Sequence, residues 1–280
     1  MSENHPLRFI PGHVAPENPG PAPRLFAFHG RELLVTESNE MPSVETIDAL
    51  GIDAVRTQYL GAFDGEPCFS AELPADFKPP TGFATRDLRM LFGAFEAELH
   101  ALAGRAVQVM EWDRTHQFCG ACGAPTELSS SDRSRACPDC AIPMYPRLAP
   151  AMIVAVERGD EILLGRARNF PPGIFSVLAG FVEPGESAEE AVIREVYEET
   201  RIIVEDVRYF GSQAWPFPNS LMLGFTARYK SGNVDTSHDD EMEAADFFHV
   251  DDLPTTFPGE ISISQWLLRD FVQRHTESGA

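Results

Sequence analysis

The stretch GFVEPGESAEEAVIREVYEETRI, residues 180–202, decides the fold of this chain. Ser187, with Glu190 three residues later, has the form of a capping box, and a Pro-Gly pair precedes it. The stretch therefore predicts a loop followed by a helix that begins near Ser187. Val192 and Val196 mark an apolar edge that can pack against a sheet. Glutamates crowd the rest of this helix, and only two residues of the stretch are basic.

The placement of the glutamates indicates what they bind. At about 100° per residue, Glu195, Glu198 and Glu199 project within an arc of roughly 100°. Like charges at this spacing destabilise a helix by roughly 0.2–0.5 kcal/mol per pair. A divalent cation would explain them, because Mg²⁺ takes oxygen ligands and is commonly shared between carboxylates and a substrate phosphate. The alternative is a solvated acidic face without a ligand, which is the usual meaning of a run of charge.

The spacing within this stretch resembles the signature of the Nudix hydrolases, which cleave nucleoside diphosphates linked to another group. Five residues separate Gly180 from Glu186, seven more separate Glu186 from Arg194, and the pattern continues to Ile202. One position departs from the family, because Arg201 stands where a glycine is usual. A left-handed residue closing the helix costs a non-glycine residue about 1–2 kcal/mol. The departure therefore affects the local turn and leaves the carboxylates intact.

Composition limits the partners of the chain. Its 280 residues include 22 basic and 43 acidic side chains, for a net charge of −21. This balance argues against broad electrostatic binding to nucleic acid or to an anionic membrane. No run of about eighteen apolar residues occurs, and the first thirty residues contain no continuous apolar segment, so neither a membrane span nor a signal peptide is expected. We therefore expect a cytoplasmic protein.

Four of the five cysteines form two CxxC pairs with fourteen residues between them, namely Cys119, Cys122, Cys137 and Cys140. Two such turns can direct four thiolates at one tetrahedral centre, which predicts a structural zinc with no open position for substrate. Two disulfides are an alternative that a reducing compartment disfavours, and a redox CxxC is another. Cys68 stands alone and is expected to be a small buried hydrophobe.

The order of predicted elements divides the chain into three parts: residues 1–113 as an N-terminal α+β domain, 114–146 as a zinc ribbon and 147–280 as a Nudix catalytic domain. In the first, RLFAFHGRELLVT (24–36) predicts a β-hairpin, and TRDLRMLFGAFEAELHALAGR (85–105) predicts a helix that ends at Gly104. Residues 11–24 are too rich in proline and glycine for regular structure.

The third part alternates strands and helices. AMIVAVERGDEILLGRAR (151–168) predicts two strands, and SLMLGFTARYK (220–230) and ADFFHV (245–250) predict further strands. A last helix is expected from about Ser262. This order fits a mixed sheet flanked by helices, which is the α/β/α sandwich that the Nudix resemblance implies.

Ten residues after the acidic stretch comes SQAWPFPNS, residues 212–220. Taken alone, its prolines predict a rigid loop, and Trp215 and Phe217 also fit core positions. Beside a diphosphate-cleaving site, such a loop is suited to holding a nucleobase by stacking. The peptide resembles, at eight of nine positions, the SQPWPFPxS marker of the NADH pyrophosphatase branch of the Nudix family. Ala214 replaces the first proline of that marker.

The resemblance implies a homodimer that hydrolyses NADH to reduced nicotinamide mononucleotide and AMP with Mg²⁺ or Mn²⁺. It implies metal ligands at Glu195, Glu199, Glu241 and the backbone carbonyl of Ala179, with Glu243 as an alternative to Glu241. Glu198 is a candidate general base. The substrate-binding residues that the resemblance implies are Tyr145, Phe181, Gln213, Ala214, Trp215, Pro216, Phe217, Pro218, Asn219, Ser220 and Ser264.

Three other functions stay open at this point. The same chemistry could remove a 5′ NAD cap from RNA, an activity associated with this branch, although the acidic balance argues against it. The chain could be a zinc-module adaptor without catalysis, and the intact glutamate set argues against that. It could also act on ADP-ribose or another nucleotide sugar.

Overall fold

The computed structural model describes residues 8–19, 23–43, 51, 53–238 and 240–277. The chain divides into two compact units, Met1–Arg147 and Leu148–Ala280. Within the described residues, the first unit contains a six-stranded and a three-stranded sheet, and the second contains another six-stranded sheet. None of the helices in the described part of the chain has the length and apolar character needed to cross a membrane.

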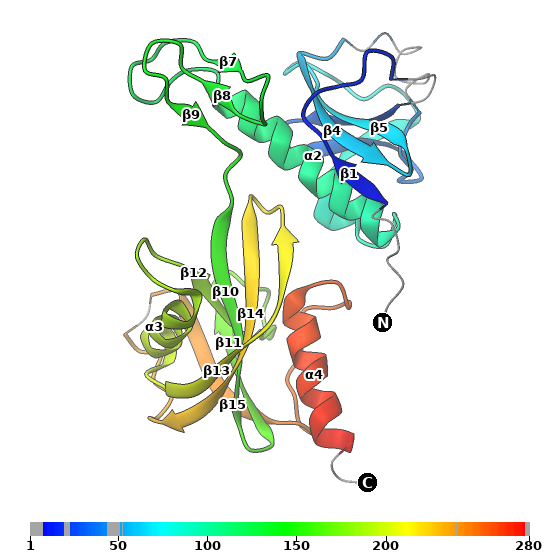
Figure 1. The fold of residues 1–280 in the computed structure, drawn as a ribbon. Helices are drawn as coiled ribbons and strands as arrows, with labels where there is room; N and C mark the ends of the chain where they lie inside the picture. Colours follow the sequence, from blue (N-terminus) through cyan, green and yellow to red (C-terminus); the bar gives the residue numbers. More distant parts are fainter. Residues whose placement is uncertain (1–7, 20–22, 44–50, 52, 239, 278–280) are drawn as a thin grey trace, which may run out of the picture. The chain divides into compact units, whose positions relative to one another are not determined.

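The larger sheet of the first unit has the strand order β1-β4-β5-β2-β3-β6. The expected hairpin is confirmed, with Phe28 of β2 opposite Leu33 of β3. Strands β4, β5 and β2 contact helix α2 (Figure 1), and Cys68 of β5 is buried, as predicted. The elements are β1 Phe9–Pro11, β2 Arg24–His29, β3 Glu32–Thr36, β4 Arg56–Phe63, β5 Glu66–Glu72, β6 Phe83–Arg86, the 3-10 turn Leu88–Leu91 and α2 Ala97–Thr115.

The helix expected over residues 85–105 is wrong at both ends. Phe83–Arg86 forms strand β6, and α2 spans Ala97–Thr115. Gly93 has a φ of 81°, so the chain cannot be helical across it. Gly104 lies buried in the middle of α2, where a glycine usually has a packing role. The sequence alone does not distinguish such a glycine from one that ends a helix.

The cysteine-rich segment folds as a three-stranded sheet within the first unit, with β7 Glu127–Leu128, β8 Arg135–Ala136 and β9 Pro143–Met144. Arg135 of β8 forms a buried ion pair with Asp113 in the last turn of α2. Gln58 of β4 donates to the other carboxylate oxygen of Asp113 at 2.9 Å. Arg133 donates to the backbone carbonyl of Tyr59 at 2.7 Å. These contacts fasten the small sheet to α2 and to β4.

The second unit is a mixed sheet between two helices. Its strand order is β13-β14-β10-β11-β15, and β12 also pairs with β10. β10 runs parallel to β14, and the other pairings are antiparallel. Helices α3 and α4 cover opposite faces (Figure 1). The elements are β10 Ala149–Arg158, β11 Glu161–Ala167, β12 Leu178–Phe181, α3 Ala188–Thr200, β13 Ile203–Trp215, β14 Ser220–Ser231, β15 Met242–His249 and α4 Ile263–Glu277.

Alternate residues of the central strand β10 pack on alternate helices. Met152 and Val154 share a core with Val192 of α3. Ile153, between them, packs with Leu267 of α4. Side chains of a strand point to opposite faces in turn, so β10 is buried on both sides. The predicted α/β/α sandwich is confirmed, as is the α+β character of the N-terminal part.

Helix α3 begins and ends as its sequence predicts. Ser187 is the N-cap, and it exchanges hydrogen bonds with Glu190 as a complete capping box. Arg201 closes the helix with φ 61° and ψ 14°, which is the left-handed conformation. Its guanidinium lies 5.0 Å from the ring centroid of Tyr197, and this cation–π contact offsets part of the cost of that conformation.

The peptide SQAWPFPNS is a hairpin rather than a long loop. Its residues up to Trp215 continue strand β13, and Ser220 begins β14. The turn is confined to residues 216–219, which contain both prolines. Proline has no backbone N–H with which to donate a hydrogen bond to a sheet. The prolines therefore lie in the turn, and the residues on either side of it form the strand pair.

Candidate active site

Neighbouring residues of strand β12 point to opposite faces of the sheet. β12 pairs with β10 so that Gly180 lies opposite Met152. Met152 packs on the α3 side of the sheet, and residues opposite each other share a face. Gly180 therefore faces α3, whereas Ala179 and Phe181 face the side that α4 covers.

Glu195 of α3 lies directly over Gly180. A Cβ at residue 180 would lie 2.0 Å from Cδ of Glu195 and 2.2 Å from its Oε1, so only glycine leaves room for this carboxylate. The Glu195 side chain is 16% exposed. Burial is the main cause that raises its pKa, and the neighbouring Arg194 acts in the opposite direction. A cation beside this carboxylate would compensate for the lost hydration of its charged form.

Arg194 joins the acidic residues of α3 to strand β12. Its Nε lies 2.6 Å from a carboxylate oxygen of Glu186, and its Nη1 lies 3.0 Å from an oxygen of both Glu195 and Glu198. Its Nη2 donates to the backbone carbonyl of Phe181 at 2.9 Å. Hydrogen bonds from Arg194 are the main cause that lowers the pKa of Glu186 to about 2. Helical periodicity did not predict this role, because Glu186 lies in the loop before the helix.

The other predicted acids differ in their surroundings. Glu198 is 55% exposed, and Glu199 is partly buried. Glu241 is exposed just before β15, and its backbone carbonyl accepts from the N–H of Arg168 at 2.9 Å. Glu243, the alternative ligand, forms an ion pair with Arg166.

The three candidate metal-binding glutamates do not form a closed ligand shell. Within the described residues, the ribbon cysteines are the only group of three or more potential ligands placed closely enough to hold a metal ion. An open arrangement is compatible with a cation such as Mg²⁺, which keeps several waters and shares its coordination with substrate phosphate.

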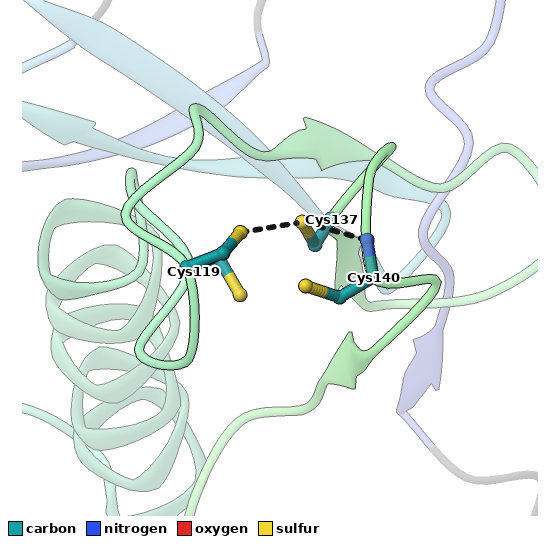
Figure 2. A group of neighbouring side chains, drawn as sticks. Cys119, Cys137 and Cys140 are labelled. Atoms are coloured by element: carbon teal, nitrogen blue, oxygen red, sulfur yellow. Dashed lines mark hydrogen bonds between the residues drawn. The ribbon is translucent and has the colours of Figure 1, made fainter.

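The four ribbon cysteines, by contrast, form a compact cluster. Their sulfur atoms all lie within 4.8 Å of one another, and Sγ of Cys122 is 3.6 Å from Sγ of Cys137. Figure 2 shows Cys119 and Cys140 directing their sulfurs into the same space as Cys137. Four sulfurs at about 2.3 Å from a zinc ion would be roughly 3.8 Å apart. The backbone N–H groups of Cys122 and Ala121 lower the pKa of the Cys119 thiol to about 7, whereas hydrogen bonds with Cys122 and Cys137 raise the pKa of the Cys140 thiol to about 12. A bound zinc ion would stabilise the thiolate form of all four.

The residues predicted to bind the base line up on the α4 side of the sheet. In register across three strand pairs, Gln213 lies opposite Met222, Met222 opposite Ala151, and Ala151 opposite Phe181. Met222 packs on the α4 side, so Gln213 and Phe181 face that side as well. Trp215, two residues after Gln213, points the same way. The ring of Phe181 is 56% exposed and is therefore accessible to a ligand.

The hairpin turn carries a pair of aromatic rings. Trp215 and Phe217 make an edge-to-face contact with ring centroids 5.0 Å apart. The backbone carbonyl of Asn219 accepts from the N–H of Ala149 at 2.9 Å, which ties the turn to β10. Of the other predicted hairpin residues, Pro216 and Ser220 are buried, whereas Ala214 and Pro218 are exposed.

Two polar residues predicted to line the pocket bond to the protein itself. The side-chain amide of Gln213 donates to the carbonyl of Ile261 and accepts from the N–H of Ile263, both at 2.8 Å. The hydroxyl of Ser264 lies 2.9 Å from that of Ser176. Contacts between segments so far apart in sequence leave no local signal, so the sequence did not predict them.

Tyr145 belongs to the first unit, whereas the other predicted pocket residues belong to the second. Its ring is 53% exposed, and its hydroxyl donates to Asp132 at 3.2 Å. Its role as a wall of the base pocket stays a prediction.

A surface groove of about 580 Å³ lies elsewhere in the second unit, between the strands β13 and β14 and helix α4. Its described lining contains none of the predicted site residues. Two of its arginines, Arg228 and Arg274, are paired with Asp206 and Glu157. The groove therefore presents few uncompensated charges and is not assigned to the site.

Three family models match consecutive parts of the chain. Residues 23–112 match the NADH pyrophosphatase-like rudimentary NUDIX domain, residues 114–145 the NADH pyrophosphatase zinc ribbon domain, and residues 146–267 the NUDIX domain. Together with the thiol cluster, the second match confirms the predicted zinc ribbon.

Curated relatives match the chain over most of its length. A protein of Stutzerimonas stutzeri named NAD-capped RNA hydrolase NudC is 41% identical over 244 residues, or 87% of each chain. A protein of the same name from Pseudomonas putida is 44% identical over 225 residues, or 80% of each chain. Among solved structures, a NUDIX hydrolase from Nitrosomonas europaea is 22% identical with a TM-score of 0.47, covering 57% of this chain and 93% of that one.

Proposed function

Because the chain belongs to the Nudix hydrolases, in the group with an NADH pyrophosphatase-type zinc ribbon, we propose that it hydrolyses the diphosphate of NADH, and also of NAD⁺. The products from NADH are reduced nicotinamide mononucleotide and AMP. The family relationship also supports a homodimer in the cytoplasm.

The observation that carries this proposal is the arrangement around strand β12. Gly180 makes room for the Glu195 carboxylate on one face. The next residue, Phe181, presents an exposed ring on the other face, the face to which Trp215 also points. One short strand thus makes room for an acid that can bind a metal and provides an aromatic surface for a base. A dinucleotide needs both functions close together, because a diphosphate joins its two nucleosides.

A divalent cation fits the acidic side of this site. The donor set is all oxygen, and Glu195 is a largely buried carboxylate that a nearby cation would stabilise. Glu195, Glu199, Glu241 and the carbonyl of Ala179 would hold the ion, and Mg²⁺ and Mn²⁺ are the ions that suit such donors. When bound, the metal neutralises phosphoryl oxygens and lowers the pKa of a water.

The chain's own residues supply orientation and proton transfer. Arg194 holds the carboxylates of Glu195 and Glu198 at 3.0 Å, so the two acids keep a fixed relation to each other. Glu198, the more exposed of them, can accept a proton from the attacking water as general base. Trp215 and Phe181 hold the base, and their stacking orients the diphosphate relative to the acids.

A second candidate function is removal of the 5′ NAD cap from RNA. It is favoured by the names of the relatives that match over 80–87% of both chains. The net charge of −21 gives no general attraction for RNA, so recognition would rely on the cap itself.

Parallel assays test these proposals. We expect NADH and NAD-capped RNA to give higher kcat/KM values than ADP-ribose, each measured with Mg²⁺ and with Mn²⁺. Hydrolysis of none of these substrates with either metal would instead support a non-catalytic adaptor.

A variant at Trp215 tests the proposed base pocket. Trp215→Ala should raise KM for NADH and leave the metal dependence unchanged, because the ring contacts the base. Tyr209→Ala removes another ring of β13, 60% exposed, and serves as the control. If both variants keep the wild-type KM, Trp215 has only a packing role.

A further inference from the structure

The segment 258–263, which ends at the first residue of helix α4, is fastened to strand β13 by one side chain. Nε2 of Gln213 donates to the carbonyl of Ile261 at 2.8 Å, and its Oε1 accepts from the N–H of Ile263 at 2.8 Å. The amide orientation is fixed, because a carbonyl needs a donor and an N–H needs an acceptor. Gln213 and Ile263 are 50 residues apart in sequence, so this clip joins two distant parts of the domain.

Other contacts seat the same segment against the sheet. The side chain of Ile263 lies over Gly224 of β14, where a Cβ would come within 2.7 Å of its Cδ1. Nε1 of Trp266 donates to the carbonyl of Glu260 at 2.9 Å. The side chain of Ile261 is left 42% exposed. The segment is therefore an ordered surface with an accessible aliphatic side chain.

The clip places this surface beside the aromatic residues of the hairpin. Gln213 and Trp215 are two residues apart on β13 and point to the same face, about 7 Å from each other along the strand. Phe181 lies in the same row as Gln213. The segment bound to Gln213 thus lies on the same face as Trp215 and Phe181, nearer to Trp215, because three strand spacings of about 4.8 Å separate Gln213 from Phe181. An apolar side chain and backbone groups in such a position are what a pocket wall needs.

We propose that Gln213 is a positioning residue, which holds segment 258–263 as a wall of the base pocket rather than binding the base itself. This inference rests on the proposed function. The side-chain amide of Gln213 is already hydrogen-bonded to the backbone of Ile261 and Ile263. Loss of the clip would leave the N–H of Ile263 without that acceptor and would loosen the wall. Base binding would weaken, whereas the acids on α3, across the sheet, would be unaffected.

The test is Gln213→Leu in the full-length enzyme, since leucine has a similar size and forms no side-chain hydrogen bond. We expect KM for NADH to rise about tenfold, because both hydrogen bonds of the clip are lost. The kcat at saturating NADH should stay within about twofold of wild type, and so should the Mn²⁺ concentration for half activation. The amide hydrogen of Ile263 should exchange at least tenfold faster. Gln273→Leu, the same change on the exposed side of α4, should leave all four quantities unchanged.

Each outcome bears on a different part of the inference. An Ile263 amide that stays protected in Gln213→Leu would show that the clip does not hold the segment. Faster exchange with an unchanged KM would show that the segment is no pocket wall. If wild type hydrolyses no dinucleotide, the proposed function fails, and hydrogen exchange still tests the clip. If Gln213→Leu does not fold, Gln213→Glu takes its place. It keeps the acceptor for Ile263 but loses the donor to Ile261, so KM should rise while Ile263 stays protected.

Discussion

Replacing Gly180 by alanine would place a methyl group where the Glu195 carboxylate lies. The added Cβ would be 2.0 Å from Cδ and 2.2 and 2.4 Å from the two oxygens of Glu195. Favourable contacts between such atoms begin at about 3.5 Å, so the carboxylate has to move by roughly 1.5 Å. The backbone at residue 180 is part of strand β12, where alanine is tolerated. The three atoms nearest to the added Cβ all belong to Glu195, so the clash falls first on that side chain.

Glu195 can respond by turning its side chain, which limits the effect on stability. An off-rotamer side chain costs about 0.5–1.5 kcal/mol, and one extra methyl in a packed site costs about 1–3 kcal/mol. The reaction is more sensitive, because a shift of about 1 Å in a catalytic group can cost about 10²-fold in rate. We expect Gly180→Ala to lower kcat for NADH about 10²-fold and to weaken Mn²⁺ binding, while the protein still unfolds cooperatively.

The assay combines NADH hydrolysis, Mn²⁺ binding by electron paramagnetic resonance and thermal unfolding. Gly211→Ala is the matched control, because it adds the same methyl to strand β13 with nothing within 4 Å, and it should behave as wild type. Wild-type kcat and Mn²⁺ affinity in Gly180→Ala would refute the reasoning, since the place of Glu195 over Gly180 would then be irrelevant to the metal site. A variant that fails to fold would refute the view that the carboxylate can turn away.

Three further predictions concern the acids and the zinc. Glu199→Gln should lower kcat by about 10²–10⁴ with folding intact. Glu189→Gln, whose side chain projects about 80° away on the helix, should keep a kcat near that of wild type. Equal activity in both variants would indicate that the acidic face of α3 is only solvated and binds no metal. Metal analysis should find about one zinc per chain, lost with Cys137→Ser, and a zinc-free wild type would contradict the four-thiolate site. The pKa of Glu186 is depressed from 4.5 to about 2, so its pairing with Arg194 stabilises the fold above about pH 5 and is lost as pH falls toward 2. Glu186→Gln should therefore flatten the fall in unfolding free energy over that range, and an unchanged slope would count against this pairing.

The elements predicted correctly are those whose signals are local in sequence. The capping box at Ser187 and the left-handed closure at Arg201 involve residues within one turn of the helix end. The strands on either side of Gly159 are joined by a tight turn, so their register follows from the sequence itself. The helix assigned to residues 85–105 failed because Gly93, with a φ of 81°, interrupts it and because Gly104 lies buried inside α2 rather than at its end.

The sequence predicted which residues are candidates for the site, but it did not predict how they are arranged in space. The motif spacing named Glu195 and Gly180 together, yet their contact depends on how α3 packs on β12. The sequence also grouped Gln213 with Trp215 as base-binding residues. The hydrogen bonds of Gln213 to Ile261 and Ile263 underlie the positioning role proposed for it, and no periodicity connects residues 50 positions apart.

The arrangement around β12 has a consequence for substrate choice. Gly180 and Phe181 are adjacent in sequence but serve opposite faces of the sheet, and Arg194 connects them by bonding both the acids and the carbonyl of Phe181. In the proposed site, the base and the diphosphate therefore lie against opposite faces of β12, and Arg194 links the two. NAD⁺ and NAD-capped RNA share the nicotinamide nucleoside and the diphosphate and differ only beyond the adenosine, whereas NADH carries the reduced nicotinamide ring. In the proposed site, β12 and the hairpin would contact the part that NAD⁺ and NAD-capped RNA share, so discrimination between these two substrates would come from residues elsewhere.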